Sequence, residues 1–304
     1  MRFTWFNLMP WPHLPDDFRQ QNRSVWVDIP GRLYDPRKGH FLYHQYMDQL
    51  EYADALGFDG KYTQLRYVNC WPKPIQEPHP PIYIPGGGSV ETWDFCADRD
   101  YNYSYLSFTG YVRGKQFLDG FWERVAAKGK DESPYRAAFA QIICVADTDR
   151  EAEELYSEHV RYFFNRCLHV YPGFADPPGY RTIKTLKAGA LAQLTEDALS
   201  KFPTLTWKQL VDDRYVIAGG PETVRQQMEE MIKGLRIGHV FCLFHNGNMP
   251  DWKTRHSSRL FAEKVMPKLR GLWPEWRDEE RWWPKPMPDR LEPEKSLPRA
   301  EARS

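Results

Sequence analysis

The chain has 304 residues, and its 41 basic side chains are balanced by 41 acidic ones, so no strongly basic face is predicted and nucleic acid is not expected as a partner. No apolar run approaches the roughly 18 to 20 residues of a membrane helix, so no membrane partner is expected either. Five scattered cysteines and a start without a secretory segment predict a cytoplasmic protein with reduced thiols and no metal site.

The first part of the chain predicts one strand, one long loop and one helix. Residues 3–8 are rich in strand-forming side chains. Residues 9–39 contain several prolines together with Trp11 and Trp26, which favours an ordered loop that covers a pocket. Apolar residues at helical spacing then predict a helix over residues 40–56.

Further along, strands and helices alternate. Short apolar segments predict strands, and amphipathic segments predict helices. The predicted strands are residues 82–84, 102–107, 137–146 and 239–244, and the predicted helices are 89–99, 116–128, 148–168, 222–236 and 254–269. This alternation is typical of a parallel α/β sheet or barrel, in which ligands bind at the carboxyl ends of the strands.

The clearest candidate binding feature is a glycine-rich turn. Gly86, Gly87, Gly88 and Ser89 follow a short strand and precede a helix. Glycines allow a ligand to approach the backbone, and the first N–H groups of a helix attract anions, so the turn could hold a phosphate. The alternative is a plain strand-to-helix turn capped by Ser89, which Glu91 and Asp94 favour because they place negative charge there.

Other motifs are weaker. The dinucleotide fingerprint fails because Glu91 stands where its third glycine belongs. His40 and His44 are four residues apart but have no third ligand at a suitable spacing, so they are expected on an outer helix face. His245 and Asn246 follow a strand and are candidates for substrate or cofactor contact.

Several long blocks resemble one known family. The blocks are residues 1–12 (MRFTWFNLMPWP), 51–60 (EYADALGFDG), 65–89, 217–224 (IAGGPETV) and 260–267 (LFAEKVMP). In this order they resemble the bacterial-luciferase-like, flavin-dependent monooxygenases over nearly the whole chain. The resemblance implies a (β/α)8 TIM-barrel-like fold that binds reduced FMN, which reacts with dioxygen to oxidise a small-molecule substrate.

The resemblance also implies site residues and partners. Gly86, Gly87, Gly88 and Ser89 would contact the flavin phosphate, and Asn7, Trp11, His245 and Asn246 would line the substrate or cofactor pocket. A separate NAD(P)H:flavin reductase and a homodimer are implied by analogy. No catalytic acid or base is assigned, since the usual histidine position has no counterpart here.

One departure from the family is large. Gly60 is followed directly by Lys61, where a family member would continue through three more βα units. We therefore expect an incomplete barrel with strands one and five to eight, formed by residues 1–276, and a disordered tail at 277–304. The first strand would pair directly with the fifth or leave an open edge.

Three functions remain from the sequence. The first is an FMN-dependent monooxygenase whose activity is impaired by the shortening. The second is a non-catalytic remnant that binds flavin weakly. The third is an oxidoreductase that uses a deazaflavin, which related barrels bind.

Overall fold

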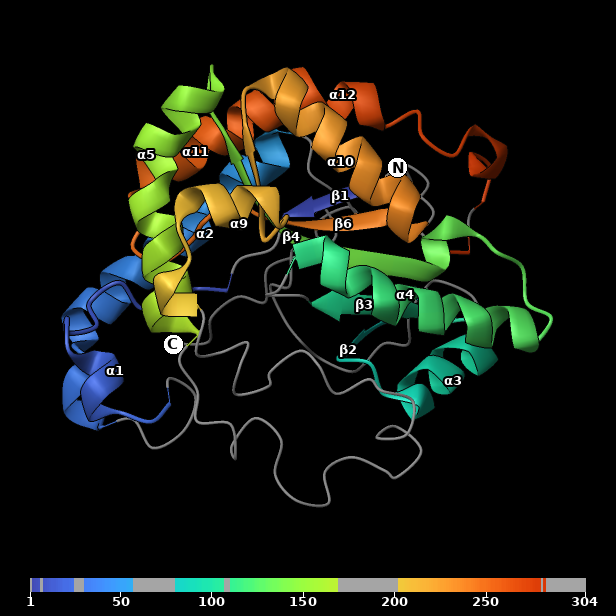
Figure 1. Cartoon of the computed structure of the whole chain (residues 1–304), viewed down its shortest axis with the longest axis horizontal. Helices are drawn as coiled ribbons and strands as arrows, with labels where there is room; N and C mark the ends of the chain where they lie inside the picture. Colours follow the sequence, from blue (N-terminus) through green and yellow to red (C-terminus); the bar gives the residue numbers. More distant parts are fainter. Residues whose placement is uncertain are drawn as a thin grey trace, which may run out of the picture.

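The computed structural model describes residues 2–5, 8–24, 30–56, 80–106, 110–168, 202–279 and 281–282. Six strands form one sheet: β1 (Arg2–Trp5), β2 (Tyr83–Gly86), β3 (Asn102–Leu106), β4 (Ala137–Val145), β5 (Val216–Gly219) and β6 (His239–Leu243). The α-helices are α1 (Phe18–Gln21), α2 (Pro36–Ala55), α3 (Val90–Arg99), α4 (Gly110–Ala127), α5 (Asp149–Tyr162), α9 (Trp207–Asp212), α10 (Pro221–Leu235), α11 (Asp251–Leu260) and α12 (Met266–Leu269). Figure 1 shows them along the sheet.

All strand pairs in the described segments are parallel, in the order β1-β6-β4-β3-β2. This is the order expected for strands one, eight, seven, six and five of a barrel. The long strand β4 is central: residues 137–140 pair with β3, and residues 142–145 pair with the additional short strand β5. β5 makes six strands where we expected five.

The described sheet does not close into a barrel. β1 and β2 are its two end members and do not pair with each other, so of the two arrangements left open by the sequence, the described residues show the open one. The sheet is nevertheless curled. In a flat sheet β2 and β6 would lie about 14 Å apart, yet the Tyr83 ring lies 5.3 Å from the His239 ring and 6.0 Å from the Phe241 ring, centroid to centroid.

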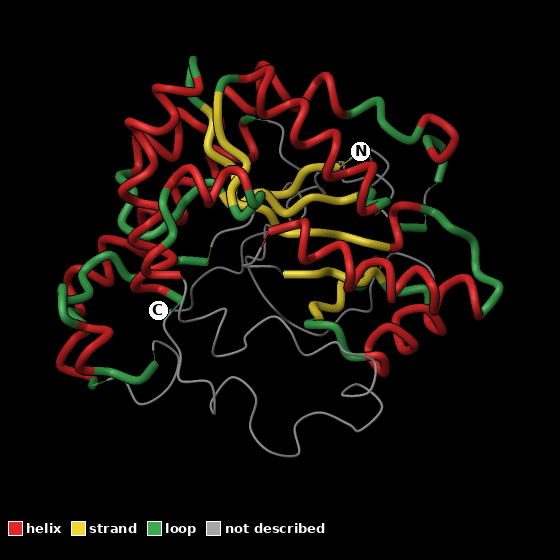
Figure 2. The backbone as a smooth tube through the Cα atoms, in the orientation of Figure 1, coloured by secondary structure: helices red, strands yellow, loops and turns green. Residues whose placement is uncertain are grey.

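Helices cover both faces of the central strands, as the strand (yellow) and helix (red) tubes of Figure 2 show. On one face, α3, α4, α10 and the segment 260–269 bury the outward residues of β1, β3, β4 and β6. On the other, α5, α9 and the turn Phe163–Cys167 bury Ala140, Ile142 and Cys144 of β4. Because β4 is buried along its whole length, its near-continuous apolar sequence needs no polar alternation.

Local sequence explains the best-predicted helix. α10 begins with Pro221 at its first position, where the missing N–H is not needed. Its apolar residues Val224, Met228, Met231, Ile232 and Leu235 are all buried, as the helical spacing predicted. Each such side chain contributes roughly 1.5–3 kcal/mol on burial. The helix ends at Leu235 and is followed by Arg236 in a left-handed conformation (φ 50°), two residues before the glycine that we expected to end it.

Several other boundaries differ from the sequence prediction. β1 is described over residues 2–5 only, because residues 6 and 7 lie outside the described ranges. α2 begins at Pro36 and not at residue 40, and α4 begins at Gly110 and not at residue 116. The predicted junction between Gly60 and Lys61 also lies outside the described residues.

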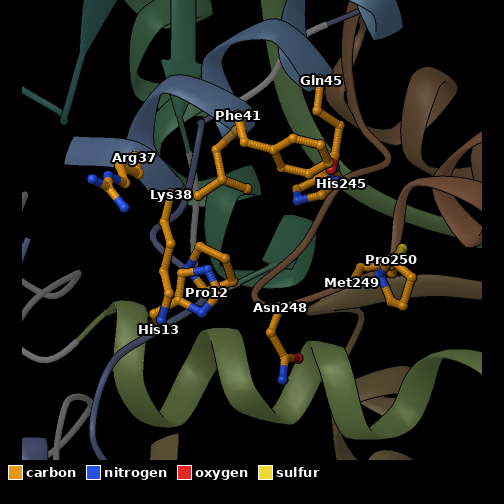
Figure 3. Close-up of a pocket in the computed structure, with 11 residues that line it drawn as sticks. Pro12, His13, Arg37, Lys38, Phe41, Gln45, His245, Asn248, Met249 and Pro250 are labelled. Atoms are coloured by element: carbon orange, nitrogen blue, oxygen red, sulfur yellow. The ribbon is translucent and has the colours of Figure 1, made fainter. Parts of the chain in front are cut away.

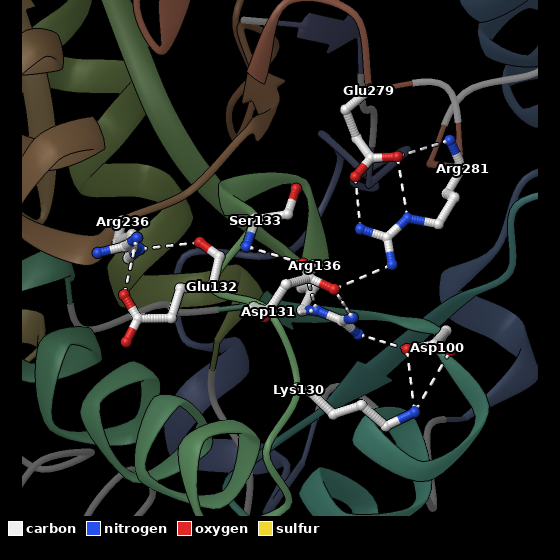
Figure 4. Close-up of polar contacts among 9 residues, drawn as sticks. All are labelled: Asp100, Lys130, Asp131, Glu132, Ser133, Arg136, Arg236, Glu279 and Arg281. Atoms are coloured by element: carbon white, nitrogen blue, oxygen red, sulfur yellow. Dashed lines mark hydrogen bonds and ion pairs between the residues drawn. The ribbon is translucent and has the colours of Figure 1, made fainter. Parts of the chain in front are cut away.

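The end of the described chain packs against the body of the protein (Figure 4). Arg281 forms an ion pair with Asp131 (2.9 Å), and the Arg136 guanidinium lies 5.0 Å from the Trp282 ring centroid. Trp282 is only 2% exposed. These contacts differ from the disordered tail that we placed from residue 277, while residues 283–304 lie outside the described ranges.

Candidate functional site

The glycine turn, Gly86 to Ser89, lies at the carboxyl end of β2 and leads into α3. Gly88 has φ 97°, a conformation that other L-residues rarely adopt. A Cβ atom on Gly86 would come within 2.7 Å of the Tyr103 ring, whereas a Cβ on Gly87 would meet nothing within 4 Å. The backbone is therefore packed on the Tyr103 side and open at Gly87.

Ser89 occupies the N-cap position of α3, as predicted, but its side chain does not cap the helix. The Ser89 hydroxyl instead donates a hydrogen bond to the Glu91 carboxylate (2.9 Å). The first bond within the helix runs from the Trp93 N–H to the Ser89 carbonyl (3.1 Å), which leaves the earlier N–H groups directed out of the amino end.

The two acidic residues near this turn behave differently. Asp94 turns towards α4, where it pairs with Arg124 (2.7 Å). Glu91 is exposed and remains beside Ser89. The turn fits a phosphate group through its backbone N–H groups and the Ser89 hydroxyl, provided that the Glu91 carboxylate moves outwards.

His245 lies just beyond the carboxyl end of β6 and is 3% exposed. Its Nδ1 atom lies 3.0 Å from the Thr254 hydroxyl and 3.4 Å from Nε2 of Gln49. Burial lowers the pKa of His245 to about 4, although Asp251 opposes this shift. The imidazole is therefore neutral near pH 7.

The neighbours of His245 also select its tautomer. The Gln49 amide nitrogen donates to the Asp251 carboxylate (2.7 Å), which fixes the orientation of the amide. Since that nitrogen can only donate, Nδ1 of His245 is the acceptor and the proton resides on Nε2. The structure gives this Nε2 atom no hydrogen-bond partner among the described residues. The result is a neutral N–H donor.

His245 lines a pocket of about 660 Å3 between the start of α2 and the segments 12–13 and 245–250, shown in Figure 3. We call it the α2 pocket. Its lining residues are Pro12, His13, Arg37, Lys38, Phe41, Leu42, Gln45, His245, Asn248, Met249 and Pro250. The pocket thus combines an apolar wall, two cations and a buried imidazole.

A second layer of polar residues supports this pocket. Nδ1 of His159 lies 2.8 Å from Oδ1 of Asn248, and the Lys253 ammonium lies 3.0 Å from Nε2 of His159. Lysine can only donate, so His159 accepts from Lys253 and donates to Asn248. Burial lowers the pKa of His159, and the Lys253 charge lowers it further. The side chain of Asn248 is therefore held in one orientation at the pocket wall.

The other predicted pocket residues lie elsewhere. Asn246 is 1% exposed, and its amide donates to the Leu243 carbonyl (3.3 Å), which closes the turn after β6. Trp11 lines a separate, mostly apolar pocket of about 460 Å3, together with Phe18, Tyr34 and Cys167. Asn7 lies outside the described residues. His40 and His44 are exposed on α2, as expected.

Sequence reasoning missed the cationic part of the α2 pocket. Arg37 and Lys38 fell within the predicted long loop, because the helix was expected to begin at residue 40. The signal that could have located them is Pro36, a residue favoured at the first position of a helix. Asp35 supports this start, since its carboxylate accepts from the Arg37 N–H (2.8 Å).

One cluster in the described residues has ligand types that metals use. Single atoms of Asp147, Glu151 and His256 lie within 4.8 Å of one another. Two of them already have partners: Asp147 lies 3.3 Å from the Lys264 ammonium, and Glu151 accepts from the Asp147 N–H (3.1 Å). The absence of a metal site stays a prediction. In the described segments, no helix combines the length and apolarity needed to cross a bilayer.

Solved structures with a similar fold include two monooxygenases and a reductase. A monooxygenase from Streptomyces bottropensis is 16% identical, with a TM-score of 0.46, over 65% of this chain and 51% of its own. The oxygenating constituent of 3,6-diketocamphane monooxygenase from Pseudomonas putida, in complex with FMN, is 21% identical, with a TM-score of 0.46. The match covers 62% of this chain and 49% of that protein. A coenzyme F420-dependent tetrahydromethanopterin reductase from Methanopyrus kandleri is 17% identical, with a TM-score of 0.40. The match covers 62% of this chain and 50% of that protein.

The chain spans about half the length of these solved structures. A family model provides the assignment. The model described as luciferase-like monooxygenase matches residues 43–237, which is more than half of the chain. This range includes the glycine turn, β2 to β5 and α10. The chain therefore belongs to the luciferase-like monooxygenase family.

Proposed function

We propose that the protein is an FMN-dependent monooxygenase that uses reduced flavin and dioxygen to oxidise a small organic molecule. The observation that carries the proposal is the glycine turn: its open backbone at Gly87 and the Ser89 hydroxyl suit a flavin phosphate at the carboxyl end of a parallel strand. Family membership supplies the reaction class. Bound FMN would supply the redox chemistry and the reaction with oxygen.

The residues of this chain would bind and orient the reactants. Backbone N–H groups at the start of α3 and the Ser89 hydroxyl would hold the phosphate. His245 follows β6 at the same carboxyl edge of the sheet. Its neutral side chain would donate a hydrogen bond from Nε2 to an oxygen of the flavin or the substrate. The buried apolar residues of the α2 pocket, Leu42 and Met249, would exclude water from that oxygen.

The proposal extends to partners and chain organisation. A separate NAD(P)H:flavin reductase would supply the reduced flavin, and the protein would form a homodimer. Residues 1–276 would make one luciferase-like domain, shortened between Gly60 and Lys61 by three βα units. These statements rest on the family resemblance of the sequence.

The open sheet favours a second candidate function. Because β1 and β2 do not pair, one side of the usual flavin enclosure is not formed by the described residues. A flavin held only by its phosphate would be open to water and would turn over poorly. The second candidate is thus a protein that binds flavin without oxygenating a substrate.

A titration with flavins, followed by a reoxidation assay, distinguishes these functions. The purified protein is titrated with FMN and with a deazaflavin while cofactor fluorescence is followed. Reduced FMN is then mixed with dioxygen, with and without the protein, and the return of oxidised-flavin absorbance is measured. We expect FMN to be quenched at saturation and the protein to delay this return relative to free reduced FMN, because a site that excludes water protects the flavin's reaction with oxygen. Quenching without any delay would favour the second candidate, preference for deazaflavin would change the cofactor, and the absence of any binding would contradict both functions.

A further inference from the structure

We propose that the α2 pocket binds a small organic acid, with its anionic head at Arg37 and Lys38 and its apolar body against Phe41, Leu42 and Met249. If the proposed function holds, this acid is the substrate class that the enzyme oxidises. The binding itself is independent of flavin and can be tested without it.

The charge of the pocket is one-sided. Arg37 and Lys38 line it, whereas no aspartate or glutamate does. Both basic side chains are exposed, and among the described residues neither takes part in an ion pair. Figure 3 shows Lys38 extending over the pocket beside His13 and Pro12. The lining of the pocket thus carries two positive charges and no negative one.

The position of these cations on α2 strengthens the inference. They lie in the first turn of a 20-residue helix that has no acidic side chain there. The amino end of a helix carries partial positive charge, so cations at this end are destabilising. A bound anion would offset both the helix dipole and the charges of the two side chains. A surface selected only for stability would place acidic side chains at these positions.

The remaining charged groups cancel this field only in part, because Asp35 sets one negative charge against the two positive ones. Asp35 is the nearest acidic residue along the chain, and its carboxylate already accepts from the backbone N–H groups of Arg37 (2.8 Å) and Lys38 (3.3 Å). The pKa of His13 is lowered, first by burial and then by the Lys38 charge, while the Asp35 charge opposes this shift, so His13 adds a mainly neutral ring at pH 7.

The rest of the pocket suits an apolar body with one polar atom. Phe41 is 69% exposed although it lines the cavity, while Leu42 and Met249 are buried behind it. Covering an exposed aromatic ring is favourable at roughly 25 cal/mol per Å2 of apolar area. The His245 Nε2–H supplies a hydrogen-bond donor at the pocket wall. An aliphatic or aromatic acid with a volume well below 660 Å3 would match the two cations, the apolar wall and the hydrogen-bond donor of the pocket.

Titration calorimetry of the full chain tests the proposal with octanoate, octyl phosphate and 1-octanol as probes. The double variant R37Q/K38Q removes both cations, and K268Q removes one exposed cation on α12 as a control. We expect octanoate or octyl phosphate to bind at least tenfold more tightly than 1-octanol. The double variant should lose that preference, while K268Q should keep it. Whichever of the two anions binds better identifies carboxylate or phosphate as the head group.

Three results would overturn the proposal: equal binding of octanoate and 1-octanol, unchanged anion binding by R37Q/K38Q, and displacement of the bound anion by FMN. The last would assign the cations to the flavin phosphate. Circular dichroism checks that the variants fold, and F41A, which keeps both charges, should weaken octanoate and 1-octanol alike. If octanoate binds but FMN does not, the pocket stands and the monooxygenase function fails.

Discussion

Glu91 controls how well the glycine turn can accept a phosphate. Its carboxylate accepts a hydrogen bond from the Ser89 hydroxyl, and this hydroxyl is the one side-chain donor among the four residues of the turn. A bound phosphate would have to replace this bond and would lie close to a like charge. The sequence correctly indicated the two opposing features, the glycines and the acidic residue. It could not indicate that Asp94 pairs with Arg124, because that contact joins residues 30 positions apart.

Replacing Glu91 by glutamine should strengthen FMN binding. The variant E91Q removes the negative charge while it keeps the size of the side chain, so we expect the dissociation constant for FMN to fall roughly three- to tenfold. Riboflavin, which lacks the phosphate, should bind both proteins equally. Fluorescence titration measures this, with E153Q on the exposed face of α5 as the charge-matched control. An unchanged FMN affinity in E91Q would place the phosphate elsewhere.

His245 predicts a pH dependence of stability. Its folded-state pKa of about 4 lies below the usual value of 6.5, so the unfolded chain binds more protons between these two values. The stabilisation is therefore complete above pH 6.5 and is lost as the pH falls towards 4, on the order of 3 kcal/mol in total. His159 contributes in the same direction, because its pKa is also lowered.

Urea unfolding between pH 4 and pH 7 checks this dependence. The variant H245Q keeps a hydrogen-bonding side chain without a titrating group, so its free energy of unfolding should fall less steeply with decreasing pH than that of the original protein. If the free energy of unfolding fell equally with decreasing pH in the two proteins, His245 would not be buried in its neutral form.

At the scale of elements, the sequence predicted the type of most helices and strands and misplaced their starts. The buried stripe of α10 and the apolar run of β4 specify their elements directly. The start of α4 depends on tertiary packing instead, whereas the start of α2 has a local signal in Pro36. Gly110 has φ 75°, and a Cβ there would lie 2.3 Å from the Arg214 carbonyl oxygen, a contact that no local pattern reveals.

The connection between β3 and β4 depends on a buried arginine (Figure 4). Arg136 is 1% exposed and pairs with Asp100 (2.7 Å) and Asp131 (2.5 Å). Although burial raises the pKa of Asp131, hydrogen bonds from Arg136 and Arg281 outweigh this effect and hold it well below its usual value. The Asp131 carboxylate therefore stays charged in the folded protein and needs its cations.

Replacing Arg136 by methionine should destabilise the protein by about 2–4 kcal/mol, because both carboxylates lose a buried cation. R236M is the matched control: Arg236 pairs with Glu132 nearby (2.9 Å), but both side chains are largely exposed, so it should cost less than about 1 kcal/mol. Chemical denaturation measures both values. Equal losses for the two variants would mean that the burial of Arg136 has no energetic consequence.

At the scale of the whole molecule, the family resemblance predicted the strand order, and the physics of barrel closure predicted the open edge as one of two outcomes. The α2 pocket could not be predicted, because it joins residues that are more than 200 positions apart in the sequence. The positions of the glycine turn and of His245 after two strands could, because parallel strands bring their carboxyl ends to one edge, while their role in binding stays a proposal. The proposed function joins these two features through one flavin.

The most direct test is therefore the difference in affinity between FMN and riboflavin, measured by calorimetry on the full chain and on G87D. A Cβ atom at Gly87 would meet nothing within 4 Å, so we expect the substitution to keep the fold, which circular dichroism checks, and to place a carboxylate at the open side of the turn. We predict that the original protein binds FMN at least tenfold more tightly than riboflavin and that G87D binds both equally. Equal binding of FMN and riboflavin by the original protein would contradict a phosphate site at the glycine turn.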